Sequence, residues 1–523
     1  MPKRAAADTR PGPEKASRSS SGQTREKPPE DEIGEFEDAW EDEIEGDEDD
    51  DAAQSDAMEV DDQVVPAIEE SDEKPRPPEV FIPGLHTLGT DEILEADESV
   101  YVMRHTMNAD WPCLSFDVLR DDSGDQRQRF PASAYIIAGT QADAATKNQL
   151  TVFKMTQLHK TQKDGRGAFF TLCWLARLTL PESDDSDSDD DDGDNLDEDA
   201  VLEYRSVPHF GGVNRVRAQP LPAGQPLPAL ARPYYVASWA ETGKVHIWDV
   251  RPLIHALETP GAIVDKERTE TPRYTVDAHG RTEGFAMDWA ASDTGALRLL
   301  TGDIHSKIYL TTSTPTGFIT QKTPFTSHTS SVEDIQWSPS EATVFASGSA
   351  DRSVRMWDVR SKGRQNVADI EKAHDSDVNV ISWNRSTAYL LLSGGDEGGI
   401  KVWDLRNVKK RGTSAPDPTP VASFMWHRAP ITSVEWHPTE DSIFAASGAD
   451  DQVTLWDLAV EQDDEETGAM DDTPENGQNV PPQLLFVHQG QKDVKEVHWH
   501  PQIPGTIIST ARDGFNIFKT ISV

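Results

Sequence analysis

The residues that could carry chemistry are few. His498 and His500 flank Trp499, and in a strand their side chains would share one face, as two ligands of a metal ion could. The only two cysteines, Cys113 and Cys173, provide neither a disulfide framework nor a cysteine-based zinc site. The sequence contains no nucleophile elbow, phosphate-binding loop or metal-spaced His/Cys cluster. We therefore expect no enzymatic activity, no metal and no cofactor, and a strand of a repeated unit explains the two histidines better.

Histidines instead mark a repeat in the sequence. The distance from a histidine to an aromatic residue is 29 residues in three units and 30 in two others, which begin at His328, His374, His427, His279 and His488. A further unit begins at His209, where a proline-rich stretch lengthens the distance to Trp248 to 39 residues. Self-similarity at a fixed period is typical of repeat architectures.

Four of these units end in the dipeptide Trp-Asp, at residues 248–249, 357–358, 403–404 and 456–457. These dipeptides resemble the signature of the WD-repeat family. The resemblance implies an all-β fold, a propeller of four-stranded antiparallel blades that stack radially because no blade can bury both faces alone. In that family a loop histidine bonds a strand Ser or Thr and the Asp of a tight turn. The resemblance therefore implies a structural role for four residues that would hold the strands of one blade together: His328, Ser347, Asp351 and Trp357.

Six units carry the histidine marker, and a degenerate unit before them would complete a seven-bladed propeller. Residues 135–140 and 148–153 resemble two strands of that first blade, and residues 167–180 can supply its outer strand. The acidic tract 182–199 then falls between blades one and two, and the tract 461–475 falls between blades six and seven. Runs of Asp and Glu have low β propensity and repel themselves, so neither tract should belong to a sheet.

A segment ahead of the repeats narrows the resemblance. Residues 91–107 place apolar side chains at roughly helical spacing and predict a helix, which leads into Trp-Pro-Cys-Leu-Ser at 111–115. Residues 95–119 resemble the N-terminal element of the histone-binding, chromatin-assembly-subunit branch of WD-repeat proteins, where a helix packs on the propeller. The acid-rich arm and the acidic insert resemble, within that branch, the glutamate-rich WD-repeat family. We expect a disordered arm, basic and then acidic, over 1–78, a docking helix within 79–110, and the propeller over 111–523.

The charge of the chain is concentrated in three tracts. Among 523 residues, 93 are acidic and 49 are basic, for a net charge of −44. Residues 30–62, 182–199 and 461–475 hold 39 acidic residues and no Lys or Arg, which leaves −5 for the rest of the chain. Phosphate contacts need clustered Lys and Arg, so a direct, backbone-dominated nucleic-acid binder is not expected, and neither is direct sequence-specific nucleic-acid binding. Residues 408–411 form a small basic patch, which we interpret as a solvated loop or a weak nuclear-import signal. No stretch is long and apolar enough to predict a membrane span.

The family resemblance implies a monomeric protein of the nucleus and nucleolus, partly cytoplasmic, that escorts a basic ribosomal protein of the L-three type. It would act in 60S subunit formation and meet pre-ribosomal particles only indirectly. The acid tracts can wrap a basic extension without geometric demands, and such binding is sensitive to salt. Within the tract 182–199 the candidate contacts are Asp189, Asp190, Asp191 and Asp192.

A second set of candidate contacts lies within the repeats. In a WD blade, the positions six and four before the mid-unit tryptophan should project to the top rim near the central channel. The partner-binding residues predicted there are Glu283, Phe285, Glu333, Asp377, Asn379, Thr432 and Asp493. Their mostly acidic character suits a basic peptide.

Two alternative functions remain open at this point. Histones are also basic, so the acid tracts do not separate a ribosomal-protein chaperone from a histone chaperone or chromatin assembly factor. Residues 248–251, 357–360 and 403–406 fit a Trp-Asp-x-Arg box, which is found in substrate receptors of cullin ubiquitin ligases.

Overall fold

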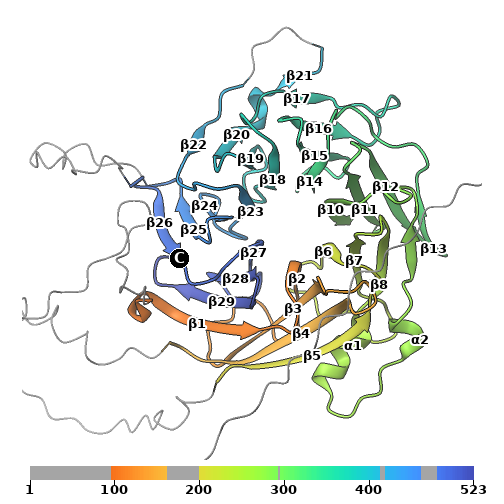
Figure 1. Ribbon diagram of the computed structural model, residues 1–523, viewed down its shortest axis with the longest axis vertical. Coiled ribbons are helices and arrows are strands. Elements are labelled where there is room, and N and C mark those ends of the chain that lie inside the picture. Colours follow the sequence, from red (N-terminus) through yellow and green to blue (C-terminus); the bar gives the residue numbers. More distant parts are fainter. Residues whose placement is uncertain (1–95, 162–198, 292–294, 413–417, 461–479) are drawn as a thin grey trace, which may run out of the picture. The chain divides into compact units, whose positions relative to one another are not determined.

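The computed structural model describes residues 96–161, 199–291, 295–412, 418–460 and 480–523. These residues form seven antiparallel sheets arranged as the blades of a closed ring (Figure 1). The prediction of a seven-bladed all-β propeller is confirmed. In every blade the innermost strand lines the central channel.

The first three blades follow the chain from the channel outward. The first contains β2 Cys113–Leu119, β3 Ala132–Thr140, β4 Gln149–Leu158 and β5 Val201–Pro208. The second contains β6 Val213–Ala218, β7 Tyr235–Ala240, β8 Val245–Asp249 and β9 Tyr274–Val276, with α1 Arg251–Glu258 and α2 Lys266–Thr269 between the last two strands. The third contains β10 Gly284–Ala291, β11 Leu297–Asp303, β12 Ile308–Thr314 and β13 Gly317–Thr320.

The next three blades repeat this order. The fourth contains β14 Val332–Trp337, β15 Val344–Ser349, β16 Val354–Asp358 and β17 Ala368–Ile370. The fifth contains β18 Val378–Trp383, β19 Leu390–Gly395, β20 Ile400–Asp404 and β22 Ala422–Phe424, with the 3-10 turn η2 Leu405–Asn407 after β20. The sixth contains β23 Ile431–Trp436, β24 Ile443–Gly448, β25 Val453–Asp457 and β26 Leu484–His488. A short strand, β21 Lys409–Lys410, leaves the fifth blade and pairs with the outer strand of the fourth.

The seventh blade closes the ring with a strand from the N-terminal side of the propeller. Three of its strands are β27 Glu496–Trp499, β28 Thr506–Ala511 and β29 Gly514–Thr520, and the fourth is β1 Tyr101–Asn108, which pairs antiparallel with β29. The prediction of a helix over 91–107 is therefore wrong in its described part, where a 3-10 turn, η1 Glu98–Val100, precedes β1. Tyr101, Met103 and Met107 are buried and two or four residues apart, which fits a strand covering the edge of β29.

The acidic inserts 182–199 and 461–475 fall within blades of the propeller and not between them. Residues 182–198 fall between β4 and β5, and 461–475 fall between β25 and β26. The predicted placement between blades is thus corrected, because the outer strand of each of these blades follows the tract and ends at or directly before the histidine that begins the next unit. The outer strand of the first blade is β5, whereas residues 167–180 lie outside the described residues.

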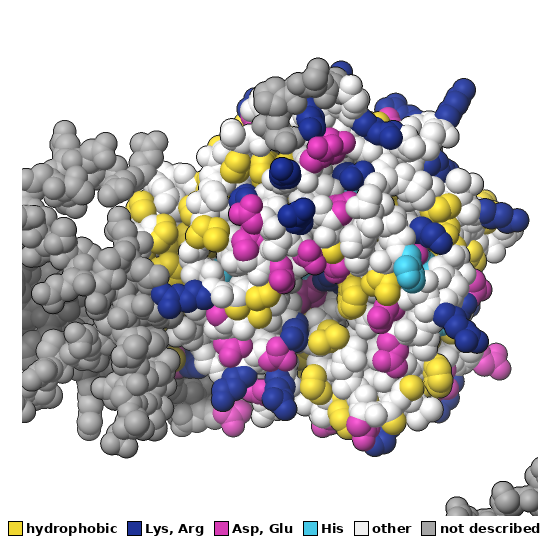
Figure 2. Space-filling model, turned by 45° about the horizontal axis from the view of Figure 1, so that its top comes forward, with side chains coloured by type: hydrophobic (Ala, Val, Ile, Leu, Met, Phe, Trp, Pro, Cys, Tyr) yellow, Lys and Arg dark blue, Asp and Glu magenta, His cyan; other side chains and the backbone are white. Residues whose placement is uncertain are grey.

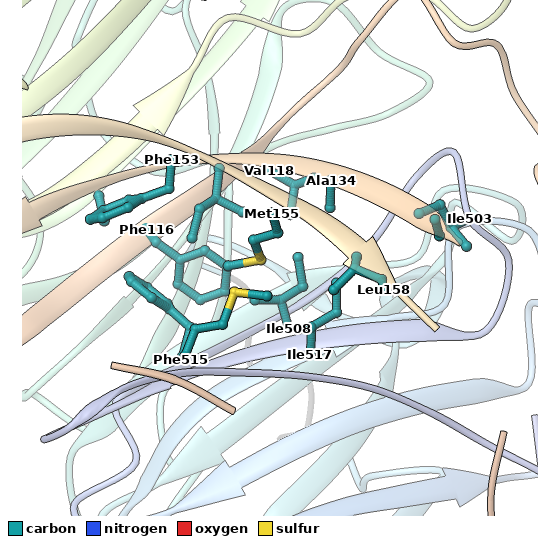
Figure 3. Close-up of a cluster of buried hydrophobic side chains, with 14 of the residues drawn as sticks. Phe116, Val118, Ala134, Phe153, Met155, Leu158, Ile503, Ile508, Phe515 and Ile517 are labelled. Atoms are coloured by element: carbon teal, nitrogen blue, oxygen red, sulfur yellow. The ribbon is translucent and has the colours of Figure 1, made fainter. Parts of the chain in front are cut away.

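Adjacent blades are joined by apolar side chains. Between the first and seventh blades, Phe116, Met155 and Ile508 are 0% exposed and meet Phe515 and Ile517 of β29 (Figure 3). Packing of this kind removes both faces of each sheet from water, which is the reason a single blade would not be stable alone. Among the described residues, no helix is long and apolar enough to cross a membrane.

Candidate partner-binding face

A chain of hydrogen bonds crosses the fourth blade. The indole N–H of Trp357 donates to Ser347 Oγ at 2.8 Å, and Ser347 Oγ lies 2.7 Å from His328 Nε2. His328 Nδ1 lies 2.9 Å from Asp351 Oδ2. Since a carboxylate only accepts, His328 carries its proton on Nδ1 and receives the Ser347 hydroxyl proton at Nε2. Every polar atom of this buried row has a partner, which gives these residues a structural role.

The other blades vary the same row. In the fifth, Glu397 replaces the turn aspartate and lies 2.5 Å from His374 Nδ1. Burial would raise the pKa of Glu397, but the hydrogen bonds from His374 and Ser376 outweigh it and lower that pKa to about 2. In the seventh, His488 Nδ1 meets the Tyr101 hydroxyl at 2.8 Å, so β1 also completes the buried row there.

Side chains of the innermost strands join each blade to the next around the channel. At six of the seven blade pairs, a carboxylate or hydroxyl oxygen accepts a hydrogen bond from a backbone N–H of the following innermost strand. The acceptors in the described ring are Ser115, Asp288, Asp334, Ser382, Glu435 and Glu496. At the remaining pair, Arg215 Nε donates to the carbonyl of Phe285 at 2.8 Å. The channel wall is thereby fixed by polar contacts that the blade repeat does not encode.

A buried charge cluster lies where the first, second, sixth and seventh blades meet. Glu496 is 1% exposed, and its Oε1 lies 2.8 Å from Arg215 Nη1 and 2.7 Å from Arg217 Nη2. His498 lies 3.0 Å from Glu435 and 3.6 Å from Glu496. Burial would raise the pKa of Glu496, but the charges of Arg217 and His498 hold it well below its ordinary range. These carboxylates are already neutralised from within the protein.

Two predicted rim carboxylates lie in a different electrostatic setting. Glu333 of β14 is half-buried, and Asp377, directly before β18, is exposed. Burial raises the pKa of Glu333; the Ser331 side chain and the charge of Arg215 offset part of this effect, and the charges of Asp377 and Asp334 add to it. Burial and then the charge of Asp396 raise the pKa of Asp377 in the same way. We call Glu333, Asp377 and Asp396 the acidic rim; its carboxylates repel one another, and an added cation would relieve that repulsion. Figure 2 shows Asp and Glu side chains around the hollow near the middle of this face.

The other predicted rim residues already have partners within the protein. Asn379 Nδ2 lies 3.4 Å from Asp396 Oδ1 and donates to the carbonyl of Ile431 at 3.2 Å. The Thr432 hydroxyl lies 2.8 Å from that of Ser447, and Asp493 pairs with Lys495 at 2.5 Å.

The predicted rim residues Glu283 and Phe285 are half-buried. Glu283 lies 3.5 Å from Asn214 Nδ2, and the carbonyl of Phe285 accepts a hydrogen bond from Arg215. The predicted contacts Asp189, Asp190, Asp191 and Asp192 lie outside the described residues. Asp396 was missed as a candidate. It directly precedes Glu397, which occupies the turn position that holds aspartate in other units. Its place in the repeat could have identified it.

Two of the three Trp-Asp-x-Arg boxes present their arginine at the surface. The guanidinium groups of Arg360 and Arg406 pair with Asp358 and Asp404 of the same box at 2.6 and 2.7 Å, and both arginine side chains are largely exposed. Arg251 is buried and donates to the carbonyl of Pro228. The three boxes are therefore not equivalent as binding elements.

The pair of histidines considered as metal ligands serves two separate networks. His498 faces Glu435 and Glu496, whereas His500 Nδ1 accepts from the backbone N–H groups of Gln502 and Ile503 at 3.1 Å. Among the described residues, no group of three or more His, Cys, Asp or Glu side chains is arranged to hold a metal ion.

Comparisons with known protein families match two parts of the chain. The family of the histone-binding protein RBBP4, which is also the family of the corresponding component of the CAF1 complex, matches residues 91–159. The family described as "WD domain, G-beta repeat" matches residues 319–358, 366–404 and 418–457, which hold strands of the third to sixth blades.

Three curated proteins resemble the chain over most of its length. The ribosome assembly protein rrb1 of Schizosaccharomyces pombe is 45% identical over 94% of this chain and 94% of its own. The protein HEAT STRESS TOLERANT DWD 1 of Arabidopsis thaliana is 42% identical over 86% of this chain and 92% of its own. The glutamate-rich WD repeat-containing protein 1 of Dictyostelium discoideum is 40% identical over 85% of each chain. With a complete seven-bladed propeller and this degree of identity, the chain belongs to the glutamate-rich WD-repeat family that includes rrb1.

Proposed function

We propose that the protein is a non-enzymatic WD-repeat scaffold that escorts a basic ribosomal protein, of the L-three type, during large-subunit assembly in the nucleus and nucleolus. The relative named as a ribosome assembly protein, 45% identical, supports a role in ribosome assembly. The choice of the L-three type rests on the family resemblance of residues 95–119 and on the placement of the acid tracts. The propeller supplies a rigid face, and the tracts supply charge.

The acidic rim is the observation that carries the proposal. Burial raises the pKa of Glu333 and of Asp377, and each pKa is raised further by a neighbouring carboxylate, Asp377 for Glu333 and Asp396 for Asp377. A lysine or arginine of a client placed among them would remove this repulsion and gain charge-assisted hydrogen bonds. The channel cluster around Glu496 offers no such gain, because its own arginines already neutralise it.

Charge reversal of the rim tests the proposal. The variant Glu333→Lys with Asp377→Lys should bind purified ribosomal protein L-three about tenfold more weakly at moderate salt, which corresponds to about 1.4 kcal/mol. The measurement is an equilibrium titration with the full chain, accompanied by a thermal melt to show that the propeller remains folded.

A matched control reverses the same number of charges elsewhere. Glu341 and Glu440 are exposed and lie after β14 and β23, at the other end of these innermost strands. Glu341→Lys with Glu440→Lys should leave the affinity within twofold. Full binding by the rim variant with a normal melt would remove this face from the proposed function.

Histone binding is the second candidate, since the match to the histone-binding family covers β1 and most of the first blade. Competition between free histone and ribosomal protein for the same immobilised chain distinguishes the two. Preferential retention of histone at moderate salt would favour a histone chaperone. A role as a ligase substrate receptor rests on the two boxes whose arginines are exposed. Co-purification of a ligase adaptor, abolished by Arg360→Ala with Arg406→Ala, would favour that role.

A further inference from the structure

Two surface connections of the propeller are rich in cations and contain no acid. Residues 359–367 join β16 to β17 and contain three Lys or Arg and no Asp or Glu. Residues 405–412 follow β20 in the fifth blade and contain four Lys or Arg, again with no acid. In a chain whose net charge is −44, such runs stand out. We call the set the basic rim, and it comprises Arg360, Lys362, Arg364, Arg406, Lys409, Lys410 and Arg411.

The fold brings these two connections together. Strand β21 crosses from the fifth blade and pairs with β17 of the fourth, with Lys410 opposite Ala368 and Lys409 opposite Asp369. The backbone N–H of Arg411 donates to the carbonyl of Val367 at 3.0 Å, and the Arg411 side chain bonds Gln365. Cations about forty residues apart in sequence thus share one outer edge (Figure 1). Figure 2 shows Lys and Arg side chains gathered toward the upper part of its view, where this edge is turned forward.

Carboxylates of the flanking strands and turns hold some cations of the basic rim in place. Asp358 and Asp404 pair with the arginines of their own boxes, and Glu371 lies 3.7 Å from Lys409 Nζ. The two connections themselves contain cations and no acid, so the edge is locally positive. At physiological ionic strength the Debye length is about 8 Å, so acidic residues farther away weaken this local field only slightly. Exposed cations of the set, which a ligand could reach, include Lys362, Lys410 and Arg411.

One contact points to the class of ligand. Arg406 lies over the ring of Tyr389, 3.8 Å from its centroid, and Asp404 holds the same guanidinium in place. The side chain of Arg406 remains 63% exposed, so its outer face forms a fixed, charged plane. Nucleic-acid bases stack on guanidinium planes of this kind, whereas acidic peptides have no flat group that uses them.

We propose that the basic rim binds single-stranded RNA, with Lys362, Lys410 and Arg411 on the phosphate backbone and Arg406 under a base. The inference goes beyond the proposed function, because the acidic rim and the client play no part in it. Contacts of this kind do not depend on base sequence, and these three phosphate contacts on a single strand give a slope near −2 in log affinity against log salt, about −0.7 for each.

Fluorescence anisotropy of a labelled oligouridylate, about 15 nucleotides long, with the full chain tests the proposal. The triple variant Lys362→Glu, Lys410→Glu, Arg411→Glu should bind at least tenfold more weakly at about 50 mM salt and show a salt slope reduced by about two. A milder triple variant with glutamine at the same positions should fall between the two and provides a test if the reversed protein does not fold.

The matched control reverses three exposed cations on the first two blades, Lys147→Glu, Arg205→Glu and Lys266→Glu, and should bind RNA within twofold of the wild type. Affinity for the basic client, measured on the same proteins, should not change with the basic-rim variants. Absence of RNA binding by the full chain, or equal loss in the control, would overturn the proposal. Tighter binding of a polyglutamate peptide than of RNA at this rim would overturn it in favour of an acidic protein partner.

Discussion

The charge of the buried channel cluster can be tested directly at His498. Burial by itself lowers the pKa of this imidazole, yet Glu435 and Glu496 raise it to about 10. His498 is therefore positively charged at neutral pH and joins the sixth and seventh blades through Glu435. A charge held in this way should stabilise the fold only while the imidazole keeps its proton.

The variant His498→Gln tests this dependence. The ordinary pKa of histidine is about 6.5, so the stabilisation should be complete below that pH and disappear as pH rises toward 10. We expect the variant to lose roughly 3 kcal/mol at about pH 6, as when one partner of a buried ion pair is removed. Thermal melts at about pH 6, 8 and 9.5 should show the gap to the wild type narrowing at each step. The control His305→Gln alters an exposed histidine and should show no such trend; a gap that is constant with pH would assign His498 a packing role only.

Among the elements, β1 shows how a single strand determines whether the ring closes. It supplies the fourth strand of the seventh blade, and Tyr101 also completes the buried row at His488. Without β1, the backbone groups of β29 and the buried side chains Phe515 and Ile517 would meet water.

Truncation separates the contribution of β1 from that of the preceding residues. A chain that begins at Ala109 should lose its cooperative thermal transition, because the seventh blade keeps three strands and an open edge. A chain that begins at Ala96 retains β1 and should melt within a few degrees of the full protein. Circular dichroism melts of the two chains provide the measurement, and a normal transition in the shorter one would show that the ring closes without this strand.

The elements also show how far the sequence predicts this fold. Regular spacing of His328, His374 and His427 from their tryptophans was enough to predict the blades, because each unit buries its histidine against a strand hydroxyl. The segment 91–107 was misassigned because its apolar residues fit a helical period about as well as the period of two seen in Tyr101, Met103 and Met107. Strand β5 was missed because an outermost strand has one neighbour and is mostly exposed, which leaves little apolar pattern to read.

The acidic rim and the basic rim also differ in how far the sequence predicts them. The acidic rim follows from an offset within the repeat, so Glu333 and Asp377 can be proposed from sequence spacing alone. The basic rim depends on β21 crossing to the fourth blade, and no periodicity encodes that crossing. Likewise, the pairing of Glu496 with Arg215 and Arg217 joins residues 281 and 279 positions apart through the closure of the ring.

At the scale of the whole molecule, charge is divided between a nearly neutral propeller and three acid tracts. The tract 182–199 enters between β4 and β5, so both of its ends are tied to the first blade. A basic client attracted to that tract is held near the propeller, where a second contact with the acidic rim becomes effectively intramolecular. Affinity should then exceed that of either part alone.

Replacement of 182–198 by a neutral Gly/Ser linker of equal length tests this cooperation, since it preserves the connection between β4 and β5. The affinity for the basic client should fall about tenfold or more at low salt, and its dependence on salt should flatten, because screened attraction to the twelve acids of 182–199 is almost entirely lost. At high salt the variant and the wild type should converge on the affinity of the rigid face. A linker variant that matched the wild type in both affinity and salt slope would show that the tract serves solubility and that client binding belongs to the propeller alone.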